Sequence, residues 1–116
     1  MIKMTVENIT EQDFLKFLNT NTIPDVGDEI ELPCGVKVIC TSARGDKFIS
    51  NPVFHFLVES LTSISINLLS AYIYTKIFET KKDAKLRINN INVKTDEESI
   101  NAKLSRENEG EDCEQE

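Results

Sequence analysis

The amino-acid sequence predicts an α+β fold in which a small antiparallel sheet packs on one long central helix. Residues 53–78 are mostly apolar and contain neither glycine nor proline, and their apolar side chains recur at the spacing of a largely buried helix. Two other segments, 29–40 and 85–95, alternate apolar and polar residues around turn sequences, as β-hairpins do. Antiparallel strands that are set apart from helices along the chain favour the α+β class.

The first expected element is a helix from Thr10 to about Asn19. The Thr10 hydroxyl can accept a hydrogen bond from the early backbone amides, and Asp13 occupies the capping-box position. The helix presents a short apolar ridge made of Phe14, Leu15, Phe17 and Leu18. We expect this ridge to dock on a larger apolar surface.

A three-stranded meander is expected next. Isoleucine and leucine alternate with glutamates from Glu29 to Leu32, and the alternation resumes from Val36 to Cys40. The intervening Leu32–Gly35 segment fits a type I turn, with proline at its second position and glycine at its fourth. The Gly45-Asp46 pair then predicts a turn into a third short strand, Lys47–Ser50.

The long helix is expected to cover Val53–Phe78, with Asn51 as its cap and Pro52 at its first position. Its narrow polar arc contains Ser60, Ser63, Asn67, Ser70 and Tyr74. Small side chains in such an arc let another helix approach closely, which would give a homodimer or a partner-binding groove. The alternative interpretation is an uncharged exposed stripe, or a stripe that receives the first helix of the same chain. Glu59 and Asn67 argue against a membrane span.

A second hairpin and a last helix complete the expected domain. Asn89-Asn90 suits the positive φ angles of a tight hairpin turn. Thr95 and Glu98 have capping-box spacing, which predicts a helix over Asp96–Arg106. We therefore expect one domain over residues 1–106 and a disordered acidic tail over residues 107–116.

The charge of the chain favours a basic partner. The formal net charge is -7 over 116 residues, and a negative field repels phosphate, so direct binding of nucleic acid is not expected. Complementary potentials instead speed encounter with basic proteins. The acidic positions expected to contact such a partner are Asp25, Asp28, Glu29, Glu31, Asp96, Glu97 and Glu98.

No catalytic, cofactor or metal signature stands out. The single histidine, His55, has no local nucleophile, and the three cysteines lack CxxC spacing, so we expect neither enzymatic activity nor a bound metal or cofactor. The amino-terminal residues do not resemble a secretion signal, which predicts a cytoplasmic protein with free thiols at Cys34 and Cys40.

These features favour a small acidic binding protein without catalytic activity. Its most concrete form is an inhibitor or immunity protein from bacterial or phage conflict, which covers the basic surface of a toxin or of a nucleic-acid-handling partner. The alternative is a homo-oligomeric assembly subunit that associates through the long serine-striped helix.

Overall fold

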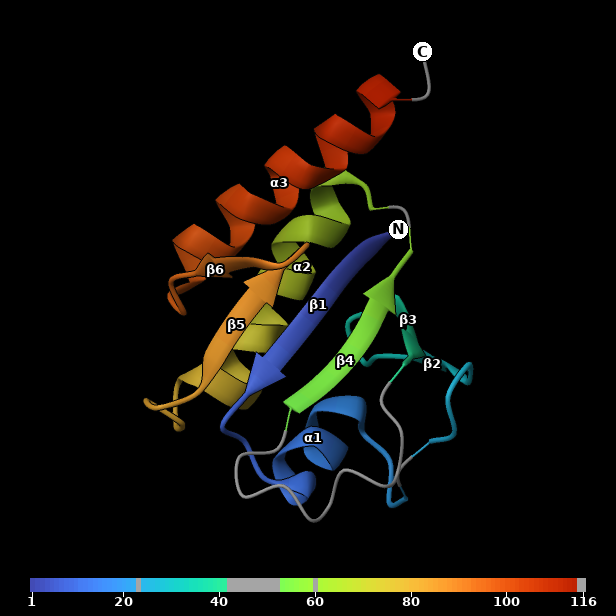
Figure 1. Ribbon diagram of the computed structural model, residues 1–116, viewed down its shortest axis with the longest axis vertical. Helices are drawn as coiled ribbons and strands as arrows, with labels where there is room; N and C mark the ends of the chain where they lie inside the picture. Colours follow the sequence, from blue (N-terminus) through green and yellow to red (C-terminus); the bar gives the residue numbers. More distant parts are fainter. Residues whose placement is uncertain (23, 42–52, 60, 115–116) are drawn as a thin grey trace.

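The computed structural model of the chain describes residues 1–22, 24–41, 53–59 and 61–114, and it confirms the α+β class. The described strands are β1 (Ile2–Glu7), β2 (Glu29–Glu31), β3 (Lys37–Cys40), β4 (Val53–Val58), β5 (Lys85–Ile88) and β6 (Ile91–Val93). The helices are α1 (Glu11–Leu18), α2 (Ser63–Ile73), the π-helix η2 (Tyr74–Phe78) and α3 (Glu97–Glu114). The strands form one antiparallel sheet in the order β2-β3-β4-β1-β5-β6, with α2 behind it (Figure 1).

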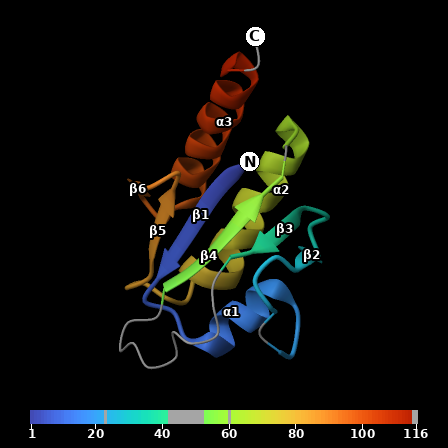
Figure 2. The same ribbon diagram turned by 45° about the vertical axis from the view of Figure 1, so that its right-hand side comes forward.

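Alternation along the strands gives the sheet one apolar face and one mixed face. On β1, Ile2, Met4 and Val6 are buried, whereas Lys3 and Glu7 on the other face are half-buried. The apolar face continues across the neighbouring strands through Val38, Cys40, Phe54, Phe56, Val58, Leu86 and Ile88. Helices cover this face (Figure 2), so the core lies between the sheet and the helices.

The predicted helix near Thr10 is confirmed as α1, and its apolar ridge docks on the sheet. The Thr10 hydroxyl accepts from the Asp13 amide at 3.1 Å, and the Asp13 carboxylate accepts from the Thr10 amide at 3.0 Å. Phe14 stacks on Phe54 with ring centroids 4.3 Å apart. Phe17 packs against Phe56, where the centroids lie 5.3 Å apart.

Strand β1 is absent from the sequence-based prediction, in which the first element is a helix. It lies in the middle of the sheet and pairs with both β4 and β5. Methionine, lysine and glutamate give this segment a weak intrinsic preference for a strand. Its conformation is therefore stabilised by two neighbouring strands and by burial of Ile2, Met4 and Val6.

The first hairpin is confirmed as β2 and β3. Ile30 pairs with Val38, and the Gly35 amide donates to the Leu32 carbonyl at 2.8 Å, as in the expected turn. The expected third strand, Lys47–Ser50, lies outside the described residues. Among the described strands, the next neighbour of β3 is β4.

The prediction of one helix over Val53–Phe78 is wrong in its first part. Val53–Val58 is strand β4, and a helix begins only at Ser63, where the Thr62 hydroxyl accepts from the Ser65 amide at 3.1 Å. Within β4 the buried and half-buried side chains alternate with a period of two. Aromatic and β-branched residues favour this state when strands can pair on both sides, and β4 lies between β1 and β3.

The second hairpin is confirmed as β5 and β6. Asn89 and Asn90 have φ angles of 51° and 67°, which match the positive φ values of a type I′ turn. Leu86 pairs with Val93 and Ile88 with Ile91. Position 91 is on the outer edge of the sheet.

The last helix begins one residue later than expected, at Glu97, and it extends beyond Arg106. Asp96, rather than Thr95, provides the capping side chain, because its carboxylate accepts from the Ser99 amide at 2.8 Å. Helix α3 continues to Glu114, through residues for which we expected a disordered tail. Ile100 and Leu104 are fully buried, so the apolar side of α3 belongs to the core.

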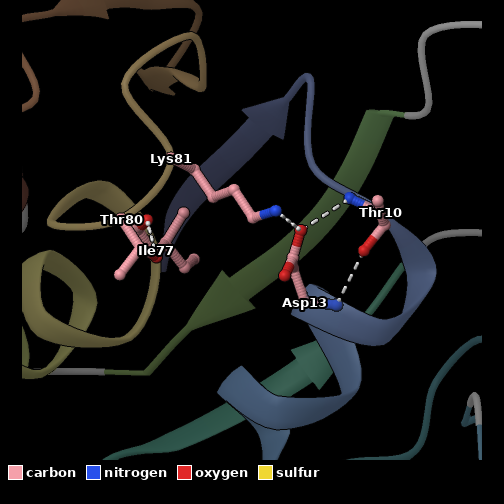
Figure 3. A network of polar contacts seen from close by, with 5 residues as sticks. All are labelled: Thr10, Asp13, Ile77, Thr80 and Lys81. Carbon is pink, nitrogen blue, oxygen red and sulfur yellow. Dashed lines mark hydrogen bonds and ion pairs between the residues drawn. The ribbon is translucent and has the colours of Figure 1, made fainter.

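A polar network joins α1 to the end of η2 (Figure 3). The Lys81 ammonium lies 3.5 Å from the Asp13 carboxylate, which also accepts from the Thr10 amide. Partial burial by itself raises the pKa of Asp13, but the hydrogen bonds from Thr10 and the Lys81 charge outweigh it and lower the pKa below its ordinary value. The network therefore fixes the chain at the point where it leaves η2.

Candidate functional site

One edge of the sheet carries exposed carboxylates. Asp25 and Asp28 precede β2, Glu29 and Glu31 lie on it, and all four are exposed. Lys37 of β3 is the one described cation paired to this group, with its ammonium 3.6 Å from Glu29. The edge therefore keeps a local excess of negative charge.

A tight turn holds the acidic residues that precede β2. The Asp25 amide donates to the Asp28 carboxylate at 3.0 Å, and the Asp28 amide donates to the Asp25 carbonyl at 3.1 Å. Between them Gly27, with a φ of 96°, donates to the Cys40 carbonyl at 2.7 Å. A positive φ of this size favours glycine, so this turn requires a glycine at position 27.

The second predicted acidic group does not join the first. Asp96, Glu97 and Glu98 are exposed at the start of α3, which follows β6. The strands β2 and β6 lie at opposite edges of the sheet, separated by five interstrand spacings or roughly 24 Å. Asp96 is also engaged locally, because hydrogen bonds from Ser99 lower the pKa of its carboxylate. The seven predicted positions therefore form two separate surfaces.

The polar arc of the expected long helix is divided between different environments. Ser60 lies outside the described residues, and Ser63 is exposed on α2. Asn67 accepts a hydrogen bond from Asn101 of α3 at 2.6 Å. Ser70 is buried, and its hydroxyl donates to the Ile66 carbonyl at 2.7 Å. Thus α3 of the same chain, rather than α1, meets the middle of the arc.

The fifth member of the arc, Tyr74, lines a groove at the opposite edge of the sheet from β2. This groove lies beside the β5–β6 hairpin, η2 and the end of β1, and has a volume of about 760 Å³. The residues around it are Glu7, Tyr74, Phe78, Lys82, Ala84, Lys85, Leu86, Arg87, Asn92, Val93, Lys94, Thr95 and Asp96. Four of these residues are cationic and two are anionic, so the residues around the groove carry a net positive charge although the chain is acidic.

The two carboxylates of the groove form hydrogen bonds or an ion pair within the chain, whereas the structure records no ion pair for the three lysines among the described residues. Glu7 binds the Arg87 guanidinium at 2.5 Å, and Asp96 accepts from the amide and the hydroxyl of Ser99. Lys82, Lys85 and Lys94 form no ion pair with any residue that the structure describes. Three exposed lysines therefore lie around the groove.

A π-turn forms one wall of the groove. The Glu79 amide donates to the Tyr74 carbonyl at 2.8 Å, which is the i→i+5 bond of a π-helix, and such turns occur frequently at functional sites. Tyr74 and Phe78, four residues apart on η2, both line the groove. Tyr74 is half-exposed and Phe78 is buried.

We did not predict this groove from the sequence, although one signal was present. Six of the thirteen lysines and arginines lie between Lys76 and Lys94, together with only two acidic residues. The negative net charge of the whole chain conceals this local excess of positive charge. Glu7, which comes from β1, has no sequence signal that would place it beside Arg87.

His55 lies on the mixed face of the sheet beside Thr5. Its Nδ1 atom is 3.1 Å from the Thr5 hydroxyl, and Thr5 is only 2% exposed. A hydroxyl buried to this degree is poorly placed to meet a substrate, so we give the pair a structural role. In the described part of the chain no three acidic, histidine or cysteine side chains gather as a metal site would require.

Comparisons with known proteins leave the chain without an assigned relative. No protein-family model, no curated protein and no solved structure matches it. Among the helices of the described segments, none has the length and apolar character needed to cross a bilayer.

Proposed function

We propose that the chain is a non-catalytic binding protein that covers a basic surface of a protein partner through its β2 edge. The contact residues would be Asp25, Asp28, Glu29 and Glu31. Such a protein would act as an inhibitor or immunity protein, and a toxin or a nucleic-acid-handling protein is the class of partner whose surface has the required charge.

The observation that carries this proposal is the coincidence of negative charge with a strand edge that no other described strand covers. The Cys40 amide donates to the Asp28 carbonyl and the Leu32 amide donates to the Val36 carbonyl, both at 2.9 Å. Because antiparallel bonding alternates along a strand, the backbone groups of Glu29 and Glu31 point away from β3. The two glutamates can therefore offer both a carboxylate and an edge for strand addition.

A matched pair of charge variants tests the proposal. The wild-type chain would be immobilised, exposed to a lysate of its source at low salt, and eluted at high salt, and the retained protein would then be purified for titration. We expect Glu29→Gln with Glu31→Gln to weaken binding roughly tenfold or more. Glu97→Gln with Glu98→Gln removes the same charge from the opposite edge and should leave the affinity unchanged. Equal losses in both variants would contradict recognition through β2.

Strand addition can be tested separately from charge. Glu31→Pro removes an amide that points outward and spares the bonds between β2 and β3. If the partner adds a strand, this variant should bind more weakly than Glu31→Gln, which loses the same carboxylate. Equal affinities of the two variants would contradict strand addition and would support an electrostatic contact alone.

A second candidate function is self-association through α2. Ile64 and Leu68, one turn apart on α2, are 72% and 48% exposed, and apolar side chains at this spacing form one stripe. In this case Ile64→Glu should abolish a concentration-dependent dimer in sedimentation, whereas Thr75→Glu at an exposed position of η2 should not. A monomer at all concentrations in the wild-type chain would exclude this candidate.

A further inference from the structure

The groove between the β5–β6 hairpin and η2 gathers three lysines that form no ion pair within the described part of the chain. The last register pair of the hairpin is Leu86 with Val93, so the next positions outward are Lys85 and Lys94. Like charges that face each other across two strands are unfavourable. The register partner of Lys85 on β1 is Glu7, but Glu7 forms its ion pair with Arg87.

We propose that this groove is a binding site for a small multiply phosphorylated ligand of about the size of a nucleotide. Lys82, Lys85 and Lys94 would supply the positive charge, and the exposed side of Tyr74 would supply an apolar surface. This inference is independent of the β2 edge, since the two surfaces lie at opposite sides of the sheet.

The donor set favours phosphate over a single carboxylate. An ammonium group has three donors and no fixed plane, so several lysines can bind the oxygens of a phosphate group as point charges. The one guanidinium among the lining residues, that of Arg87, donates through Nη2 to Glu7, while its buried Nε has no hydrogen-bond partner among the described residues. A monoanion would also leave two of the three lysines without a counterion, so a di- or triphosphate balances the site better.

The size and shape of the site favour a small molecule. A volume of about 760 Å³ lies within the range of small-ligand sites. The walls come from η2, the segment after it and the β5–β6 hairpin, and the Lys81–Asp13 ion pair joins the segment after η2 to α1. Because the chain has a net charge of -7, long polyanions would meet repulsion beyond the groove.

An NMR titration tests this proposal directly. Amide shifts of the ¹⁵N-labelled chain would be followed during addition of ATP and, separately, of inorganic tripolyphosphate. We expect saturable shifts confined to residues 74–96 and to the end of β1. The double variant Lys85→Gln with Lys94→Gln should bind roughly 30-fold more weakly. Lys3→Gln with Lys16→Gln removes the same charge from sites outside the groove and should change the affinity by less than about twofold.

The two probes also distinguish what the site recognises. Binding of both ATP and tripolyphosphate supports recognition of the phosphates, and tighter binding of ATP adds a contribution from Tyr74. The proposal would be overturned if neither anion produced saturable shifts, or if the control variant lost as much affinity as the groove variant. It would also be overturned if hexaglutamate or a single-stranded oligonucleotide bound more tightly than ATP, since the groove would then serve an acidic macromolecule.

Discussion

The two edges of the sheet differ in charge, in shape and in the way they are supported. At the β2 edge, exposed carboxylates lie on a three-residue strand whose one partner among the described strands is β3. At the other edge, lysines surround a groove whose walls come from β5, β6 and η2. An exposed acidic strand edge suits the surface of another protein, whereas a groove lined by basic residues suits a small anion. A total charge of -7 describes neither surface.

The two edges also depend differently on the rest of the molecule. The groove is tied to β1 by the ion pair of Glu7 with Arg87 and to α1 by the ion pair of Lys81 with Asp13. The β2 edge is held by its turn and by the bonds to β3. Substitutions in β1 or α1 should therefore disturb the groove more than the acidic edge, and this difference can be tested.

The largest expected effect comes from removing the support that both edges share. Phe56 of β4 is fully buried and packs against Phe17, and β4 connects β3 to β1. We expect Phe56→Ala to lower the free energy of unfolding by about 3–5 kcal/mol, as measured by urea denaturation. Ile64→Ala, at an exposed position of α2, should change it by less than about 0.5 kcal/mol. Similar losses in the two variants would contradict the strand assignment of Val53–Val58.

A smaller loss of stability is expected when the ion pair between Glu7 and Arg87 is removed. Glu7→Gln removes the carboxylate that binds Arg87 at 2.5 Å, and both side chains are only partly exposed, so stability should fall by about 1.5 kcal/mol. The same change makes the groove more positive, and ATP should bind more tightly. As a control, Glu31→Gln at the other edge also removes one negative charge, but it should change neither the stability of the chain nor its affinity for ATP. Weaker binding of ATP by Glu7→Gln would show that Arg87 must be held in place.

In the network that joins α1 to the end of η2, the substitution Asp13→Asn should lower the free energy of unfolding by about 1 kcal/mol. The pKa of Asp13 is lower in the folded chain than in the unfolded chain. Its stabilisation is therefore complete above an unfolded pKa of about 3.9 and is lost as the pH falls through the folded value. Urea denaturation between pH 2 and pH 6 should show a smaller loss of stability at the acidic end for Asp13→Asn than for the wild-type chain. Parallel curves would contradict this assignment.

The features that could be predicted from the sequence are those that depend on neighbours along the chain. The box of Thr10 and Asp13, the Leu32–Gly35 turn and the Asn89-Asn90 turn are each set by a few consecutive residues. All three are present at the expected positions. Local chemistry was therefore sufficient for them.

The features that could not be predicted depend on distant pairing. Strand β4 resembles a helix in its hydrophobicity, and it becomes a strand because β1 and β3 pair with it. Likewise, the groove combines Glu7 with residues 74–96. No pattern in one sequence shows that β1 will lie beside β5, so the surplus of lysines could be noticed but not located.

The smallest effect on stability is expected at the acidic edge itself, and this contrast with the groove sharpens the comparison. The ion pair of Glu29 with Lys37 is 3.6 Å long, and both side chains are about half exposed, so solvent screens it strongly. Glu29→Gln should change the free energy of unfolding by less than about 0.5 kcal/mol. If Glu29 contacts a basic partner, the same variant should slow association at low salt, as measured by stopped-flow mixing with the purified partner, and the difference should disappear as salt is raised. A large loss of stability would instead make this glutamate part of the scaffold, and the acidic edge would no longer be a surface kept free for binding.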